Sequence, residues 1–185
     1  MLFAYLDILR ASPVAFITIA GSAAMALIVG IAFHEFNHAY AANRLGDPTP
    51  QRMGRLTLNP LAHLDPVGSL MMLVVGFGWG KPVQFNPRYL KDPHTGAALI
   101  GFAGPLSNFV VASLAAIPLK LGLIPIVFPN VPVRAVEFFG AEEYLGMFLT
   151  SVVIFNTLLG IFNLIPIPPL DGFKVALGIL PRDLA

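Results

Sequence analysis

Residues 13–44 read PVAFITIAGSAAMALIVGIAFHEFNHAYAANR, and this stretch decides the class of fold. Its first part, residues 13–33, contains no charged side chain. A helix crosses the hydrocarbon core of a membrane with about 20 apolar residues, and at about 1.5 Å per residue residues 13–44 are longer than that. We therefore predict a membrane-spanning helix that either projects from the bilayer or bends at one of its glycines, Gly21 or Gly30.

The composition of the whole chain also indicates a membrane protein. Of its 185 residues, 56% are hydrophobic and only 11% are charged, and the mean hydropathy is +0.77. Soluble domains carry roughly 25% charged residues, so this chain has too few charges to cover a surface that faces water. Its length predicts a single membrane-embedded domain, residues 1–185. The net charge of +1 and the lack of a Lys/Arg run exclude a nucleic-acid partner.

Four further apolar regions follow the first one. Residues 95–119 and 144–165 are long enough for two more spans. Residues 67–79 are too short for an ordinary span, and we interpret them as a re-entrant segment. Residues 121–133 are broken by prolines, which is typical of an interfacial segment or loop. The predicted fold class is an all-α polytopic membrane protein.

The basic residues support this topology, because Lys and Arg are enriched in cytoplasmic loops. If residues 67–79 are re-entrant, one side of the membrane receives a large basic group: Arg44, Arg52, Arg55, Lys81, Arg88 and Lys91. The opposite loop, residues 120–143, holds only two basic residues, and the two in the C-terminal part return to the first side. A full crossing would divide the basic residues almost evenly. We therefore predict that residues 44–91 face the cytoplasm.

The first span leads into a metal-binding motif, His34-Glu35-Phe36-Asn37-His38. Residues i and i+4 share one helix face, so both imidazoles can reach one ion. A zinc ion with three protein ligands keeps one position open and lowers the pKa of a bound water to about 7. Glu35 would accept that proton and pass it to a leaving amine. Ionisable groups beside an apolar span are costly, which favours this interpretation over an interfacial cluster just past the helix end.

Such a site needs a third ligand. The extended motif of one soluble metalloprotease class would require a glycine and a third histidine, but Ala41 and Arg44 stand there. The glutamates within residues 137–143 lie on the predicted far side. Asp171 is the better candidate, because it follows the third span in the segment NLIPIPPLDG and returns to the side where the histidines lie. The alternative is an aspartate that only caps a turn.

The segments HEFNH and NLIPIPPLDG occur together with NPLAHLDP (59–66), GWGKPV (78–83), Asn86-Pro87 and GPLSN (104–108). This set resembles the site-2 protease family of intramembrane zinc metalloproteases, over about residues 30–175. The resemblance implies a three-helix catalytic core that cleaves transmembrane helices. It implies one zinc ion (Zn2+) per chain. His34, His38 and Asp171 would be the ligands of this ion, and Glu35 would be the general base.

The same resemblance places Asn108 and Asn163 near the metal, as donors to the substrate carbonyl or its oxyanion. Preoriented amide donors stabilise the negative charge that develops there during hydrolysis. Two simpler roles stay open. Asn108 would otherwise make an interhelical hydrogen bond, and Asn163 would otherwise hold the proline-rich turn in place.

The resemblance further implies a transmembrane protein as substrate, and a multi-pass location in a prokaryotic plasma membrane with the site toward the cytoplasmic side. The lipid bilayer is the other partner. The chain matches the short form of the family, since it has no region long enough for the PDZ or CBS domains of longer relatives. It ends at Ala185 within an amphipathic pattern, which predicts a truncated C-terminus.

Residues 76–87 alternate glycine, aromatic and proline residues, and we interpret them as an extended segment or hairpin that dips into the membrane. This agrees with the small membrane-associated β-structure of the family. The peptide groups of a membrane helix are bonded internally, so a substrate must unwind before it is cut. An exposed strand edge at residues 83–85 would hold the unwound segment by β-augmentation.

Two other classes of protein stay open. One is a catalytically inactive metal-binding membrane protein, although such a protein would need the ligands and not Glu35. The other is a transporter with a metal site at the membrane midplane, which the lack of internal repeats and of paired broken helices disfavours. For His63 and Asp65 we favour structural hydrogen bonds over a second metal site.

Overall fold

The computed structural model describes residues 2–75 and 79–181, apart from the side chains of residues 2–5, 69 and 72–75. The helices are α1 (Leu2–Ala11), α2 (Pro13–Arg44), α3 (Thr49–Arg52), α4 (Pro66–Val75), α5 (Pro93–Lys120), α6 (Ala141–Asn163) and α7 (Asp171–Ile179). Three short 3-10 helices lie between them: η1 (Pro60–Ala62), η2 (Pro87–Tyr89) and η3 (Val133–Phe138). These described residues form no β-strand, and the predicted all-α class is confirmed.

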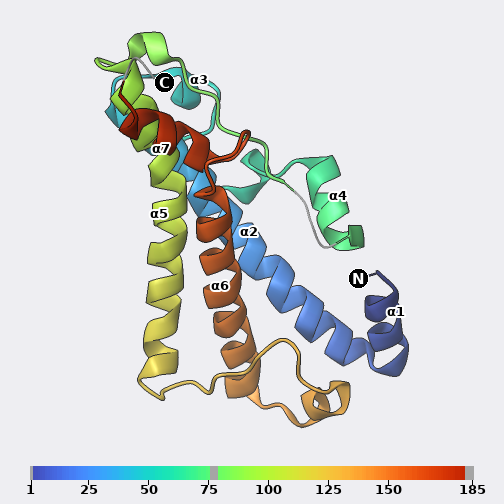
Figure 1. Ribbon diagram of the computed structural model, residues 1–185. Helices are drawn as coiled ribbons and strands as arrows, with labels where there is room; N and C mark the ends of the chain where they lie inside the picture. Colours follow the sequence, from blue (N-terminus) through green and yellow to red (C-terminus); the bar gives the residue numbers. More distant parts are fainter. Residues whose placement is uncertain (1, 76–78, 182–185) are drawn as a thin grey trace.

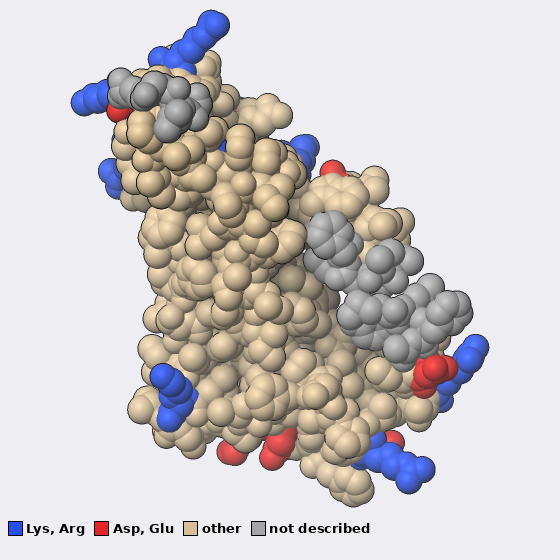
Figure 2. Space-filling model, in the orientation of Figure 1, with Lys and Arg blue, Asp and Glu red and all other residues tan. Residues whose placement is uncertain are grey.

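Three of the helices, α2, α5 and α6, are long and apolar enough to cross a membrane. They coincide with the three predicted spans. Helix α2 is continuous over its 32 residues, which at about 1.5 Å per residue makes it longer than a bilayer core. On the face shown in Figure 2, the charged side chains gather near the two ends of the bundle, and a band without them lies between.

Local sequence explains where two of these helices begin. Ser12 precedes α2 and its hydroxyl accepts a hydrogen bond from the backbone N–H of Ala15 at 3.3 Å. Asp92 precedes α5 and accepts from the N–H of His94 at 3.1 Å. Serine and aspartate are preferred at this capping position, and a proline follows each as the first helical residue, where its missing N–H costs nothing.

Each of the three long helices packs against the other two, and α7 packs against α5. Figure 1 shows α5 and α6 side by side, α2 crossing them at an angle, and α7 at the end where α5 begins. Small residues permit this close approach, as is common between membrane helices. A Cβ atom on Gly160 of α6, for example, would lie 2.8 Å from the ring of Phe109 of α5. Gly160 therefore leaves the space on α6 that the ring of Phe109 occupies.

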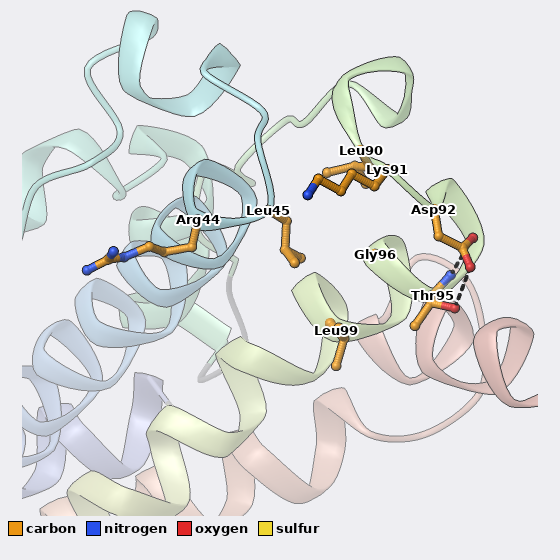
Figure 3. A pocket seen from close by; sticks show the side chains of 8 residues that line it. All are labelled: Arg44, Leu45, Leu90, Lys91, Asp92, Thr95, Gly96 and Leu99. Carbon is orange, nitrogen blue, oxygen red and sulfur yellow. Dashed lines mark hydrogen bonds between the residues drawn. The ribbon is translucent and has the colours of Figure 1, made fainter.

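The long connection between α2 and α5 starts and finishes at the same end of the bundle. The end of α2, the start of α5 and the residues directly beside them line one hollow, which Figure 3 shows: Arg44, Leu45, Leu90, Lys91, Asp92, Thr95, Gly96 and Leu99. Helix α4 lies within this connection and has 10 residues, which at about 1.5 Å each are too few to cross a bilayer. Its placement inside the membrane stays a prediction, and residues 76–78 of the predicted re-entrant segment lie outside the described residues.

The predicted β-structure reduces, in the part of the chain that is described, to one isolated antiparallel bridge between Leu64 and Gly80. The bridge continues into a hydrogen bond from the N–H of Lys81 to the carbonyl of His63, at 2.7 Å. Residues 81–86 then run without helical structure toward η2. Backbone hydrogen bonds to side chains hold this segment, for example from the N–H of Asn86 to Asp47 at 2.6 Å.

The loop between α5 and α6 also agrees with its prediction as a non-spanning segment. Residues 123–132 are irregular, and η3 follows. Within η3, Val136 is fully buried against Ala15 and Ile19 of α2 and Met147 of α6. This small apolar cluster fixes the far end of the bundle, opposite α7.

Candidate metal centre

Three ligand-type side chains converge where α7 meets α2. His34 and His38 lie one turn apart on α2, and Asp171 is the first residue of α7. All three are buried. The two Nε2 atoms lie 2.9 Å apart, and the Oδ2 atom of Asp171 lies 3.0 Å from that of His34 and 2.9 Å from that of His38. The structure thus brings together the three residues that were predicted as ligands.

The chemistry and spacing of this cluster fit a metal ion. Two imidazoles and one carboxylate are a ligand set that catalytic zinc uses, with bonds of about 2.0–2.2 Å. Tetrahedral bonds of that length set the donor atoms about 3.3 Å apart. The observed separations are a few tenths of an ångström smaller, so the three side chains need to open only slightly to hold an ion.

The sequence after α6 explains how Asp171 reaches the histidines. Helix α6 ends at Asn163, and the prolines that follow prevent its continuation. Helix α7 then starts directly against the end of α6, because Gly172 has no side chain. A Cβ atom there would clash with the carbonyl of Leu164 and lie 2.6 Å from the carbonyl of Ile165.

The electrostatics around Asp171 keep its carboxyl ionised. Burial by itself would raise the pKa of Asp171, but the two neighbouring imidazoles, His34 and His38, outweigh burial and hold the pKa well below its usual range. Lys174, one turn later on α7, donates to the second oxygen, Oδ1, at 2.9 Å. One carboxylate oxygen therefore faces the histidines and the other is held by a lysine.

Helix α5 approaches the cluster at Gly104. A Cβ atom there would clash with Nε2 of His38 and would lie 2.7 Å from Nε2 of His34. A side chain at this position would therefore occupy the space in which the ligand atoms meet.

The second nitrogen of each imidazole is also engaged. Nδ1 of His34 lies 2.7 Å from Oδ1 of Asn108, and Nδ1 of His38 lies 2.7 Å from the carbonyl oxygen of Ile100. Both partners are on α5. A carbonyl can only accept, so each Nδ1 carries the proton and each Nε2 keeps its lone pair. This is the arrangement usual for metal-ligating histidines.

Glu35 lies beside the cluster and is half-buried. Its Oε2 atom accepts a hydrogen bond from the backbone N–H of Val83 at 2.9 Å. Gly80 is close as well, since a Cβ atom on it would lie 3.7 Å from Oε1 of Glu35. The segment of residues 80–83 therefore covers Glu35.

The two predicted asparagines differ in their surroundings. Asn108 is fully buried, and its Nδ2 atom donates to the carbonyl of Gly30 at 3.1 Å and to Oδ1 of Asn156 at 2.9 Å. The interhelical bonds left open for Asn108 are thus present. Asn163 donates to the carbonyl of Leu159 in its own helix at 2.9 Å. For both residues a role toward substrate stays a prediction.

Asn156 was not predicted, although the sequence contains a signal for it. It is an amide within an apolar span, and it precedes Asn163 by seven residues, which places both on one face of α6. His63 and Asp65, in contrast, make local contacts. Nε2 of His63 lies 2.7 Å from the carbonyl of Thr57, and Asp65 accepts from the N–H of Gly68 at 2.8 Å.

The sequence is similar to proteins named as zinc metalloproteases in two bacteria and an archaeon. It is 38% identical over 156 residues to "Putative zinc metalloprotease YwhC" of Bacillus subtilis, across 84% of this chain and 67% of that protein. It is 32% identical to "Putative zinc metalloprotease Rip2" of Mycolicibacterium smegmatis, across 79% and 52%. It is 25% identical to "Zinc metalloprotease MJ0392" of Methanocaldococcus jannaschii, across 84% and 33%.

No protein-family profile matches the chain, and no solved structure matches it significantly. The chain spans two thirds of the length of YwhC and about half of that of Rip2. The aligned part includes most of this sequence, and the ligand cluster has the chemistry that the names of these relatives state. The chain therefore belongs to the family of zinc metalloproteases that these relatives represent, the site-2 protease family.

Proposed function

We propose that this protein is a zinc-dependent endopeptidase that hydrolyses peptide bonds in the transmembrane helices of other membrane proteins. One observation carries the proposal. His34, His38 and Asp171 meet at one buried point among helices that are long and apolar enough to cross a membrane. A hydrolytic centre at such a place has membrane-embedded peptide segments within reach.

In this proposal each residue of the motif has a separate task. His34, His38 and Asp171 hold one zinc ion, which supplies a Lewis acid and lowers the pKa of a water molecule. Glu35 accepts the proton from the attacking water and passes it to the leaving amine. Its Oε2 atom is held by the N–H of Val83, so Oε1 is the oxygen that we assign to proton transfer.

We also propose that Asn163 donates a hydrogen bond to the substrate carbonyl. It stands at the end of α6, is only partly buried, and precedes the turn that delivers Asp171. The corresponding prediction for Asn108 requires one of its N–H groups to leave Gly30 or Asn156, since both already have acceptors. In its present contacts Asn108 acts on His34.

The substrate segment would bind along residues 81–86. Within the described part of the chain, the N–H of Val83 is used by Glu35, while Gln84 is exposed. Successive residues of an extended segment point to opposite sides, so the N–H of Gln84 is available for an unwound substrate strand. β-Augmentation of this kind supplies backbone hydrogen bonds that the substrate lost on unwinding.

We place the protein in a prokaryotic plasma membrane as one multi-pass domain with the metal centre toward the cytoplasmic side. The clustering of basic residues between α2 and α5 supports this orientation. Helix α4 would enter the membrane from that side without crossing it.

The decisive experiment compares wild type with Glu35→Gln in detergent, on a model transmembrane substrate and with zinc measured in both proteins. Glutamine keeps the size of the side chain but is not a base. We expect Glu35→Gln to retain zinc and to lose cleavage by about 100- to 10,000-fold, the usual contribution of general acid–base catalysis. Equal cleavage by both proteins would refute the catalytic assignment.

His34→Ala and Asp171→Ala are the matched variants for the ligands. Each removes one of three donors, so we expect both to lose zinc together with activity. A wild-type protein that holds zinc but cleaves no membrane substrate would favour the alternative, a catalytically inactive metal-binding membrane protein.

A further inference from the structure

Asn156 is a fully buried amide in the second half of the apolar helix α6. An amide without hydrogen-bond partners is costly in such surroundings. Both ends of this amide are used. Its Nδ2 atom donates to the carbonyl of Val152 at 3.0 Å, and its Oδ1 atom accepts from Nδ2 of Asn108 at 2.9 Å. Asn156 therefore links α6 to the residue that contacts His34.

Two backbone carbonyls fix which group donates in each hydrogen bond of this series. The backbone carbonyls of Val152 and Gly30 can only accept. Val152 therefore requires the N–H end of Asn156, which turns the oxygen of Asn156 toward Asn108. Gly30 and Asn156 together require both N–H groups of Asn108. The oxygen of Asn108 then has one remaining direction, toward Nδ1 of His34 at 2.7 Å.

This polarity determines which nitrogen of His34 carries its proton. Nδ1–H of His34 donates to Asn108, so a neutral imidazole keeps its lone pair on Nε2, the atom that faces His38 and Asp171. We propose that Asn156 is a positioning residue that acts through Asn108 to hold His34 in the tautomer that binds the metal. The expected effect on zinc binding rests on the proposed function. The tautomer of His34 does not depend on it.

The packing of α2 against α6 supports a specific fit. A Cβ atom on Gly30 would lie 2.9 Å from Oδ1 and 3.3 Å from Cγ of Asn156. Gly30 thus supplies both the space for the amide of Asn156 and the carbonyl that Asn108 needs. For His38 the position of the proton on Nδ1 is fixed by a single contact, with the backbone carbonyl of Ile100.

The test uses the full chain in detergent, with zinc affinity measured by competition with a chelator. Asn156→Leu keeps the approximate volume and removes the acceptor. We expect zinc to bind about 10- to 100-fold more weakly, as for other losses of an outer partner of a metal ligand. Asn156→Asp should bind close to wild type, because a buried carboxyl that is protonated accepts from Asn108 and donates to Val152.

A second pair of variants separates positioning from stability. If Asn156 acts through Asn108, the double variant Asn108→Leu/Asn156→Leu binds zinc no more weakly than Asn108→Leu alone. Ser151→Ala is the matched control, since Ser151 is equally buried on α6 but outside this chain of bonds. Its zinc affinity should not change. Additive losses in the double variant would show that Asn156 only joins two helices and would overturn the inference.

Nitrogen NMR of metal-free, histidine-labelled protein reads the tautomer directly, and the chain has only four histidines. We expect the Nδ1–H form of His34 in wild type and in Asn156→Asp, and a mixture in Asn156→Leu. The Nε2–H form in wild type would overturn the inference even if no variant folds. A wild type with the expected tautomer that does not bind zinc would instead contradict the proposed function.

Discussion

Gly104 of α5 faces the Nε2 atoms of both histidines, and its missing side chain leaves the space in which they and Asp171 meet. The ligands themselves come from α2 and α7. At the scale of single residues, the centre therefore depends on a helix that contributes no ligand. That helix supplies the space at Gly104 and the acceptors for both Nδ1 atoms, at Ile100 and Asn108.

We predict that Gly104→Ala weakens zinc binding. The new Cβ atom would lie 2.7 Å from Nε2 of His34 and closer still to His38, so at least one imidazole must move. Overpacking of this kind costs about 1–3 kcal/mol, which corresponds to about a 5- to 150-fold loss of affinity. Gly21→Ala on α2 is the control, because a Cβ atom there meets nothing within 4 Å. Equal zinc affinity in the two variants would contradict the prediction.

The residue scale also shows what sequence reasoning can reach. His34, Glu35 and His38 follow from their spacing on one helix, and Asp171 followed from topology together with the resemblance. Asn156 was missed because a single amide in an apolar span indicates no particular role until its hydrogen-bond partner is known. Its bond to Asn108 joins residues 48 positions apart in the chain, and no local pattern encodes that distance.

At the scale of elements, the three long helices were predictable because a helix that crosses a membrane needs a run of about 20 apolar residues, and such runs are visible in the sequence. Their ends were less so. Helices α5 and α6 start at Pro93 and Ala141, a few residues before the apolar stretches. For α5 the two extra residues follow a polar cap, Asp92, which a search for apolar residues does not detect. The extended segment after α4 was predicted, but its bond to Glu35 depends on tertiary packing.

We predict that Val83→Pro reduces cleavage without loss of zinc. Proline has no N–H, so Glu35 loses the hydrogen bond that holds Oε2. A hydrogen bond to a charged group is worth about 1.5–3 kcal/mol, and we expect cleavage to fall by about 10-fold or more. Turnover of the model substrate and bound zinc, measured on the same preparation, check this.

Val83→Ala is the matched control, because it keeps the N–H and removes most of a buried side chain. It should cleave more like wild type than Val83→Pro does. Gln84→Pro tests substrate binding on the opposite edge of the segment and should lower cleavage while the bond from Val83 to Glu35 persists. Unchanged cleavage in both proline variants would contradict the assignment of residues 81–86 to Glu35 and to the substrate.

At the scale of the whole molecule, the helix order and the charges agree on one arrangement. Helices α2 and α5 have adjacent ends, since both line the hollow of Figure 3. The connection between them, together with Arg44 at the end of α2, carries six of the 11 basic residues of the chain. Basic residues in short loops set orientation toward the cytoplasm, so the end that holds α7 and the metal centre is the one we assign to the cytoplasmic side.

The absence of cysteine from the sequence makes this orientation directly testable, because each introduced thiol is the only one. Arg52, Arg88 and Lys120 are all exposed, and they lie before α4, after α4 and at the end of α5. With a membrane-impermeant thiol reagent on intact cells, we expect Lys120→Cys to react. Arg52→Cys and Arg88→Cys should react only after the membrane is opened.

Opposite behaviour of positions 52 and 88 would mean that the segment with α4 crosses the bilayer. The basic residues would then divide between the two sides, and the argument for a cytoplasmic metal centre would fail. Labelling of positions 52 and 88 together from outside would leave α4 re-entrant but reverse the orientation.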